Sequence, residues 1–396
     1  MTAAVSSDLR ERAAEVFAKL GWPTTRIEEW RYTNLAPLSK IAWRTDDAPQ
    51  PVDSPATLAG RAAAEFVFVN GRLVNRSGSV GELTSERNTI ADWERNAMVA
   101  LNTANAQDGA RIEIPAGTVF DGFIHLLFIG TGDGVWSHPR NVIAVGAHSQ
   151  VSIVETYVGS GSYFTNAVTE ILAEEGAVVD HTKVECESLT AYHVGNVFIH
   201  QARAANVTSR TFAVGAALAR NETHVVLGGE GASIALDGLF AGTGSQHLDN
   251  RTVVDHVYPH CESLELYKGV LDQNARGVFD GRIIVRPGAQ KTVSRQENRN
   301  LLLSETAVVD SKPTLEIHND DVKCNHGSTI GQLDEQAMFY LRSRGIDEAE
   351  ARGLLIYAFA SELVDRVKLE PVREQMRRAL FRAMPGRLPE RRGGNR

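Results

Sequence analysis

Cys324 and His326 are the two residues in this chain whose types and spacing could bind a metal. The alternating apolar residues Leu315 and Ile317 predict the start of a half-buried strand. If that strand continues through Val322, the side chains of Cys324 and His326 point to the same face, because side chains alternate along a strand. A thiolate beside an imidazole offers two ligands for a soft or borderline metal.

Two ligands do not complete a tetrahedral site. The pair is therefore either not a metal site, or a site whose other ligands come from another chain. The spacing alone favours the first interpretation, with Cys324 as a small buried hydrophobic residue and His326 as a hydrogen-bonded polar residue.

The sequence contains few other motifs that indicate a binding or catalytic site. It contains no phosphate-binding Gly-x-x-x-x-Gly-Lys-Ser/Thr loop, so we expect the chain not to bind or hydrolyse nucleotides by itself. His256, His260 and Cys261 are close in sequence, but His260 and Cys261 would face opposite sides of a strand. A shared metal there requires a bend at Pro259.

The composition is that of a soluble globular protein. The 396 residues are 43% hydrophobic and 23% charged, and the net charge of −8 argues against a nucleic-acid partner. No apolar run is long enough to cross a membrane, and charged residues interrupt the N-terminus, so we predict no membrane association. The three cysteines are far apart, which argues against a disulfide framework and favours a cytoplasmic protein.

The middle of the chain is predicted to form many short strands. From about residue 110 to 326 they follow one another with almost no helical periodicity, and Gly-Ala pairs recur at separations near 28 residues or twice that. A strand-rich repeat of this size indicates a solenoid whose coils stack on one another. The fold class is therefore predicted as mainly β, a parallel β-helix, with an open β-sandwich as the alternative.

The two ends of the chain are predicted to be helical. An amphipathic helix covers residues 7–21, and an Asn70-Gly71 hairpin follows further on. After Gly331, the pattern predicts a helix over 333–341, a second capped by Asp347, and a third opened by Pro371 before an arginine-rich tail. We expect three regions: an N-terminal helical and mixed region (1–109), the β-helix core (110–330) and a C-terminal helical region (331–396).

Several motifs in the right order resemble the SufB/SufD family of iron–sulfur cluster assembly proteins. The matching segments are Pro259–Ser263, Ala275–Gly281, Gln296–Leu303, Leu315–Ile317 with Asp320–Gly327, and Phe339–Ile346, together with Glu28–Thr33 near the N-terminus. Within the family, the chain is more similar to SufD than to SufB, because SufB proteins are usually longer and carry a glutamate where this chain has Gly327.

The resemblance implies a right-handed parallel β-helix between helical regions, in agreement with the strand pattern. It also implies a non-enzymatic scaffold that pairs with a SufB-like subunit through the β-helices. A SufC-like ABC ATPase would bind the C-terminal helical region, and we predict that substitutions on the apolar face of the helix at 347–367 abolish that binding without unfolding the β-helix.

The resemblance assigns the cofactor-binding and metal-binding role to His326, with Cys324 as the weaker candidate. The ligand would be a transient iron–sulfur cluster shared with the partner subunit, which explains why this chain alone carries too few ligands. Two other interpretations remain: a homodimeric SufB-like scaffold working without a SufD partner, and a β-helix carbohydrate-active enzyme. The second would need an acidic pair in an exposed groove.

Overall fold

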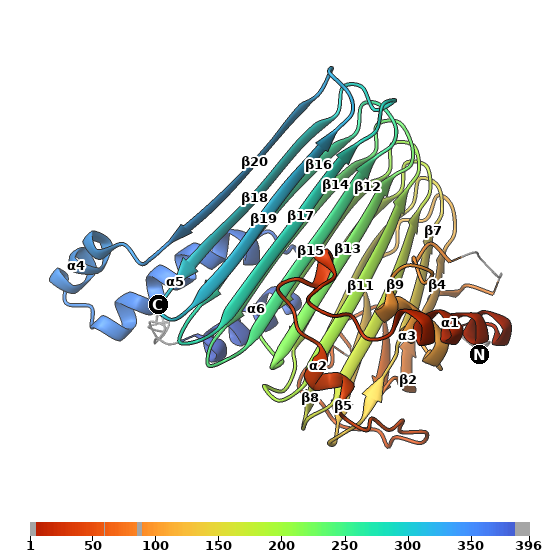
Figure 1. Cartoon of the computed structure of the whole chain (residues 1–396), viewed down its shortest axis with the longest axis horizontal. Helices are drawn as coiled ribbons and strands as arrows, with labels where there is room; N and C mark the ends of the chain where they lie inside the picture. The colour runs from red at the N-terminus through yellow and green to blue at the C-terminus, as the bar shows by residue number, and fades with distance from the viewer. Residues whose placement is uncertain (1–4, 59, 85–88, 385–396) are drawn as a thin grey trace.

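Two sheets of parallel strands, stacked coil upon coil, form the body of the molecule (Figure 1). The computed structural model describes residues 5–58, 60–84 and 89–384. The chain passes from one sheet to the other in each coil, so each strand pairs with strands from the coils before and after it. The prediction of a mainly β, parallel solenoid with helices at its ends is confirmed, and the β-sandwich alternative is wrong.

The sheets are named after their last strands. The β20 sheet has the order β2-β1-β5-β8-β10-β12-β14-β16-β18-β20, and the β19 sheet has the order β19-β17-β15-β13-β11-β9-β7-β4-β3, with β6 beside β9. The strands are β1 (Ala64–Val69), β2 (Arg72–Gly78), β3 (Gly81–Glu82), β4 (Arg111–Ile114), β5 (Ile124–Thr131), β6 (Trp136–Ser137), β7 (Arg140–Val145), β8 (Gln150–Ser160), β9 (Phe164–Ala173), β10 (Val178–Cys186), β11 (Tyr192–Gln201), β12 (Asn206–Ala213), β13 (Leu218–Leu227), β14 (Ser233–Gly242), β15 (His247–His256), β16 (Glu262–Leu271), β17 (Arg276–Val285), β18 (Val293–Leu302), β19 (Val308–Ile317) and β20 (Lys323–Gly331).

The predicted repeat length matches the coil length. Val178 is in register with Gln150 and with Asn206, 28 residues away in each direction. The residue directly before each of the strands β10, β12, β14 and β16 has a small, buried side chain. These residues are Ala177, Ala205, Ala232 and Cys261. Cys261 therefore takes an alanine's place in the stack, and its thiol donates to the carbonyl of Gly229 at 3.3 Å.

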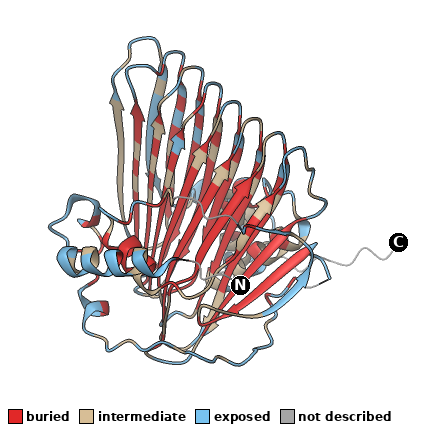
Figure 2. Ribbon diagram, turned by 90° about the vertical axis from the view of Figure 1, so that its right-hand side faces the viewer, coloured by how far each residue is buried: buried red, intermediate tan, exposed pale blue. Residues whose placement is uncertain are grey.

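Side chains alternate between the lumen, the space enclosed by the two sheets, and the outer faces. The lumen is filled by apolar residues in the first coils and contains more polar residues towards β18. Burial is nearly complete along the middle of the solenoid and is lost at one end, where the last strands are exposed or intermediate (Figure 2).

The N-terminal elements cover the outer face of the β19 sheet. They are α1 (Ser7–Leu20), the 3-10 turn η1 (Glu28–Trp30), α2 (Ala36–Ser39) and α3 (Ala97–Asn105). Trp30 is buried, and the guanidinium of Arg220 lies 3.9 Å from its ring centroid. The Glu28–Thr33 motif therefore packs against the solenoid, and the cation–π contact of Trp30 with Arg220 stabilises this packing.

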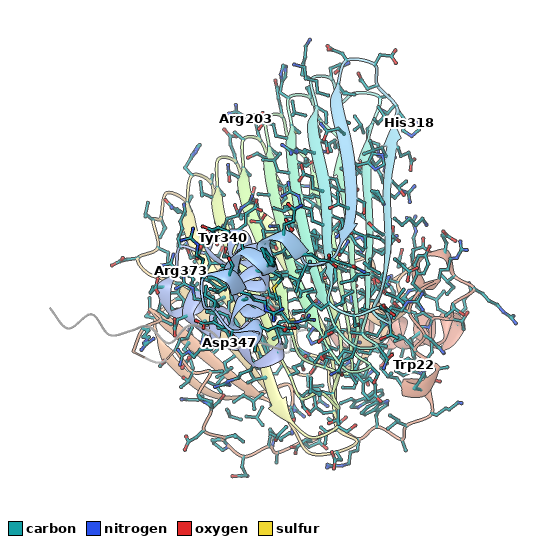
Figure 3. All side chains as sticks on the ribbon, turned by 90° about the vertical axis from the view of Figure 1, so that its left-hand side faces the viewer. Trp22, Arg203, His318, Tyr340, Asp347 and Arg373 are labelled. Atoms are coloured by element: carbon teal, nitrogen blue, oxygen red, sulfur yellow. The ribbon has the colours of Figure 1, made fainter. Side chains whose placement is uncertain are left out.

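The C-terminal helices lie on the other side. They are α4 (Glu335–Ser343), α5 (Glu348–Val364) and α6 (Glu370–Ala383). α5 and α6 pack against the outer face of the β20 sheet, and α4 contacts α5 (Figure 1). Ile356 and Leu363 of α5 pack with Leu266 of β16, and Asp347 caps α5 by accepting from the amide of Glu350. Figure 3 shows Tyr340 and Asp347 on this side and Trp22 on the other.

The termini follow the sequence prediction closely. The 7–21 helix, the Asn70-Gly71 hairpin and the three C-terminal helices are present, and Asn70 and Gly71 both have positive φ. The strands β1 and β2 lie within the predicted N-terminal region but belong to the β20 sheet, while the division at 109/110 and 330/331 stays a prediction. The end of the arginine-rich tail, residues 385–396, lies outside the described residues.

Candidate functional site at the open end of the solenoid

Cys324 and His326 lie on β20, the last strand of its sheet. The predicted continuous strand from Leu315 through His326 is wrong: β19 ends at Ile317, the chain turns, and β20 begins at Lys323 in the opposite sheet. The turn is required because the coil must close, and Asn319 holds it by donating to the carbonyl of Pro287 at 2.6 Å.

The prediction that Cys324 and His326 share a face agrees with the register. Cys324 is opposite Ser294 and His326 is opposite Gln296 on β18. Ser294 and Gln296 are both buried in the lumen. Because residues in register on parallel strands point the same way, Cys324 and His326 also face the lumen, at the end of the solenoid that no further coil covers.

Cys324 is the more enclosed of the two residues. It packs against Ile283, Val285 and Ala289 of the preceding coil. Burial raises the pKa of the Cys324 thiol, and a hydrogen bond from the backbone N–H of Ser294 opposes that change. Cys324 in the isolated chain is therefore a protonated, partly buried thiol and a poor ligand until a metal displaces its proton.

His326 is exposed, and no residue of the described chain hydrogen-bonds to its side chain. It borders a groove of about 410 Å³ that runs along the end of the β20 sheet. The groove is lined by Arg295, Glu297, Asn298, Arg299, Asn325, His326, Gly327 and Thr329. A neutral imidazole in this position is free to act as a ligand to a group brought by another molecule.

On the outer side of the groove, the negative charge of Glu297 is offset by two neighbouring arginine side chains. This carboxylate pairs with both Arg295 and Arg299, and the two guanidinium groups contribute to lowering its pKa. Gly327 lies opposite Glu297, and a Cβ atom at Gly327 would meet nothing within 4 Å. The space beside Gly327 is therefore open to a partner's side chain.

Within the described residues, no strand pairs with the outer edge of β20, so its backbone presents hydrogen-bonding groups there. Its first N–H, that of Lys323, donates to Thr292 on the β18 side at 2.8 Å. Because successive peptide groups of a strand alternate in direction, the N–H groups of Cys324, His326 and Ser328 point away from β18, to the free edge. A long free edge is a template for pairing with another chain.

The second sequence candidate for a metal site is not supported by the geometry. Cys261 is in the stacked alanine position, and His256 faces the lumen, where its Nε2 lies 2.9 Å from Ser263 Oγ. Burial lowers the pKa of His256 to about 4. Within residues 5–58, 60–84 and 89–384, no three or more His, Cys, Asp or Glu side chains gather as a metal site.

Two lumen residues near His326 were missed by the sequence analysis. Glu265 on β16 is in register with Gln296, which is in register with His326. Burial raises the pKa of Glu265 to about 7, against the opposing effect of hydrogen bonds from Gln296 and Thr252. Gln296 is the first residue of one matching motif, but only the register shows that it lies beside His326.

These features define a class of protein: a β-solenoid with a cysteine, a histidine and a free strand edge at its open end. The family model for the SufBD core domain of SUF-system iron–sulfur cluster assembly matches residues 128–359. The chain therefore belongs to the SufBD family of iron–sulfur cluster assembly proteins. In the described part of the chain, no helix is both long and apolar enough to span a membrane.

Individual relatives match almost end to end. A SufBD family cluster assembly protein of Synechocystis is 31% identical, over 94% of this chain and 89% of its own length. The cluster assembly protein SufD of Escherichia coli is 30% identical, over 93% of this chain and 90% of its own length. SufD of Bacillus subtilis is 25% identical, over 93% and 92% of the two chains.

Proposed function

We propose that this chain is a SufD-like, non-enzymatic scaffold subunit that works in the cytoplasm. It pairs with a SufB-like subunit through the open end of the solenoid, and the nascent iron–sulfur cluster is held at the seam by His326 together with ligands of the partner. The observation that carries the proposal is the free edge of β20, with His326 exposed on it and without a hydrogen bond in the described chain. The two full-length relatives named SufD support the choice of branch.

The geometry explains why the cluster would be shared. His326 and Cys324 are the metal-binding side chains of β20, and two protein ligands leave coordination positions of a cluster iron unfilled. A partner strand laid along the edge of β20 would bring its own side chains next to His326. Cys324, with its raised pKa, is the second candidate ligand.

The position of the ATPase partner needs a correction to the sequence prediction. The apolar face of α5 is not available for docking, because Ile356, Ala360 and Leu363 are buried against the β20 sheet. By contrast, Phe339 and Tyr340 of α4 are 75% and 58% exposed. We propose that a SufC-like ATPase, which supplies the nucleotide-binding site, docks on α4, where two aromatic side chains are exposed.

The proposal is tested by anaerobic co-expression of this chain with SufB-like and SufC-like partners. The complex is characterised by native mass spectrometry and by its iron and sulfide content, for the unchanged chain and for His326→Ala. We expect the complex to form in both cases and the cluster content to fall in the variant. His318→Ala is the matched control, because His318 is an exposed histidine at the end of the same coil (Figure 3).

Two results would contradict the proposal in different ways. An intact complex with unchanged iron and sulfide in His326→Ala would make His326 a structural residue. A chain that forms only homodimers in the presence of the partners would support the homodimeric scaffold instead.

A further inference from the structure

A row of polar side chains runs along the lumen and ends at His326. Gln296 donates from Nε2 to Glu265 Oε2 at 2.6 Å, and Thr252 donates to the same oxygen at 3.2 Å. Glu265 and Gln296 are 2% and 0% exposed. His326 is in register with Gln296 on the next strand, so it occupies the next position in this row. Neighbouring strands of a sheet are about 4.8 Å apart.

The orientation of the Gln296 amide is determined by Glu265. Oε2 of Glu265 accepts from Thr252, and an ionised carboxylate has no hydrogen to donate to Gln296. The amide must therefore turn its NH2 group towards Glu265. Gly281 on the opposite sheet makes room for this arrangement, because a Cβ atom there would lie 2.4 Å from Gln296 Nε2.

This orientation leaves Gln296 Oε1 without a partner. The oxygen is buried, and no donor in the described residues reaches it. A buried carbonyl oxygen without a donor is costly, so such a group calls for an explanation. Because Nε2 of the amide faces Glu265 on one neighbouring strand, Oε1 is on the side of the other neighbouring strand, β20, where His326 is in register with Gln296.

We propose that Gln296, held by Glu265, is a positioning residue for His326. Once a partner covers the end of the solenoid, Gln296 Oε1 accepts a hydrogen bond from one ring nitrogen of His326. The neutral ring then has its other nitrogen free, directed at the seam and available to a cluster iron. The inference rests on the proposed function, because it assumes that His326 is a ligand.

The physical reason is the one that applies to histidine ligands in general. A hydrogen bond to the second ring nitrogen selects one tautomer, restricts rotation of the ring and raises the basicity of the ligating nitrogen. Loss of such a partner typically weakens metal binding by about 10–100-fold. An exposed histidine at a strand edge has no other constraint in the described chain.

The test uses the complete complex with its partners, in which only this chain carries ¹⁵N-labelled histidine. Pulsed electron paramagnetic resonance of the reduced cluster reports the histidine nitrogen bound to iron, and loss of iron to EDTA reports how tightly the cluster is held. For Gln296→Met, which keeps the length of the side chain, we expect an altered nitrogen coupling and iron loss faster by about tenfold. Gln290→Met, the same substitution at an exposed glutamine that does not line the groove, is the matched control.

A swapped pair separates positioning from a purely structural role. In the double variant Glu265→Gln with Gln296→Glu, the amide and the carboxylate exchange places, so the bond between them and an acceptor for His326 are both kept. We expect the double variant to recover the nitrogen coupling and slow iron loss. Coupling and iron loss that remain normal in Gln296→Met, or a double variant as impaired as Gln296→Met, would overturn the proposal.

The proposed function of His326 and the positioning role of Gln296 are contradicted by different results. If His326→Ala leaves the cluster content unchanged, the proposed function of His326 is wrong and the positioning role falls with it. If His326→Ala loses the cluster while Gln296→Met keeps both the coupling and the iron, only the positioning role is wrong.

Discussion

At the scale of single residues, the lumen near the open end is unusual because it buries an acidic side chain. Glu265 is held by Gln296 and Thr252, but its Oε1 atom is buried without a partner in the described chain. Burial raises the pKa of Glu265 to about 7, so its carboxyl group is protonated at mildly acidic pH. Ionisation of this buried group at higher pH destabilises the folded state.

We predict that Glu265 makes folding stability depend on pH. The folded chain keeps the proton up to about pH 7, whereas the unfolded chain loses it near 4.5. The folded state therefore loses stability as the pH rises through this window, by up to about 3 kcal/mol. Glu265→Gln removes this effect, so its stability relative to the unchanged chain should improve from pH 5 to pH 8, as measured by urea denaturation.

Glu297→Gln is the control for this experiment. Its neighbours Arg295 and Arg299 contribute to lowering the pKa of Glu297, so the group is ionised in both states above pH 5 and adds no slope there. A stability difference for Glu265→Gln that is flat from pH 5 to pH 8 would mean that Glu265 titrates normally.

At the scale of secondary-structure elements, the three C-terminal helices have different roles. α5 and α6 bury apolar side chains against the β20 sheet. Lys268 of β16 also binds α5, because its Nζ donates to the carbonyl of Phe359 at 2.8 Å and forms an ion pair with Glu362. α4 has no buried residue. A helix that contributes so little to the core is available for a partner, which is why we place ATPase docking there.

We predict that α4 and α5 respond oppositely to substitution. Phe339→Ala with Tyr340→Ala should abolish capture of a SufC-like ATPase while changing unfolding stability by less than about 0.5 kcal/mol. Leu363→Ala, which opens a cavity under α5, should cost about 2–5 kcal/mol. Pull-down with the ATPase and denaturation curves check the two effects, and full ATPase capture by the α4 double variant would rule out this docking surface.

At the scale of the whole molecule, the solenoid is finished at one end and open at the other. The first coils are flanked by the antiparallel strands β2 and β3, whereas no strand in the described part of the chain lies beyond β19 and β20. The two last strands are bridged by Ser328 and Ser311, whose hydroxyl groups are 2.8 Å apart. An exposed end of this kind either associates with another chain or must be protected against doing so.

We predict that a proline in β20 separates partner pairing from folding. The N–H of Ser328 points to the free edge, so Ser328→Pro removes an outward donor but no bond to β18. One lost backbone bond of about 1 kcal/mol weakens pairing with a SufB-like subunit roughly fivefold. Ser328→Ala is the control, since it loses the same hydroxyl but keeps the N–H.

Titration of the partner against each variant measures this effect. Thr329→Pro should instead destabilise the chain itself, because the N–H of Thr329 points towards β18. Equal affinities for Ser328→Pro and Ser328→Ala would show that the edge of β20 is not the pairing surface.

Local patterns in the sequence were enough for the general architecture. The recurrence near 28 residues predicted the solenoid, because each coil repeats the same small buried position, and helix caps such as Asp347 predicted the C-terminal helices. The motifs also predicted the family, which the comparisons confirm. These signals are readable because they depend on neighbours within a few residues or on a fixed repeat.

Strand pairing, by contrast, determines where the coils begin and end and which residues lie opposite one another on neighbouring strands. The turn after Ile317 moves Cys324 and His326 to the other sheet, and closing the coil requires it although the apolar pattern gives no sign of it. Likewise, Gln296 lies beside His326 because strands 30 residues apart are in register. Contacts of this kind depend on the pairing of distant strands, which no local spacing encodes.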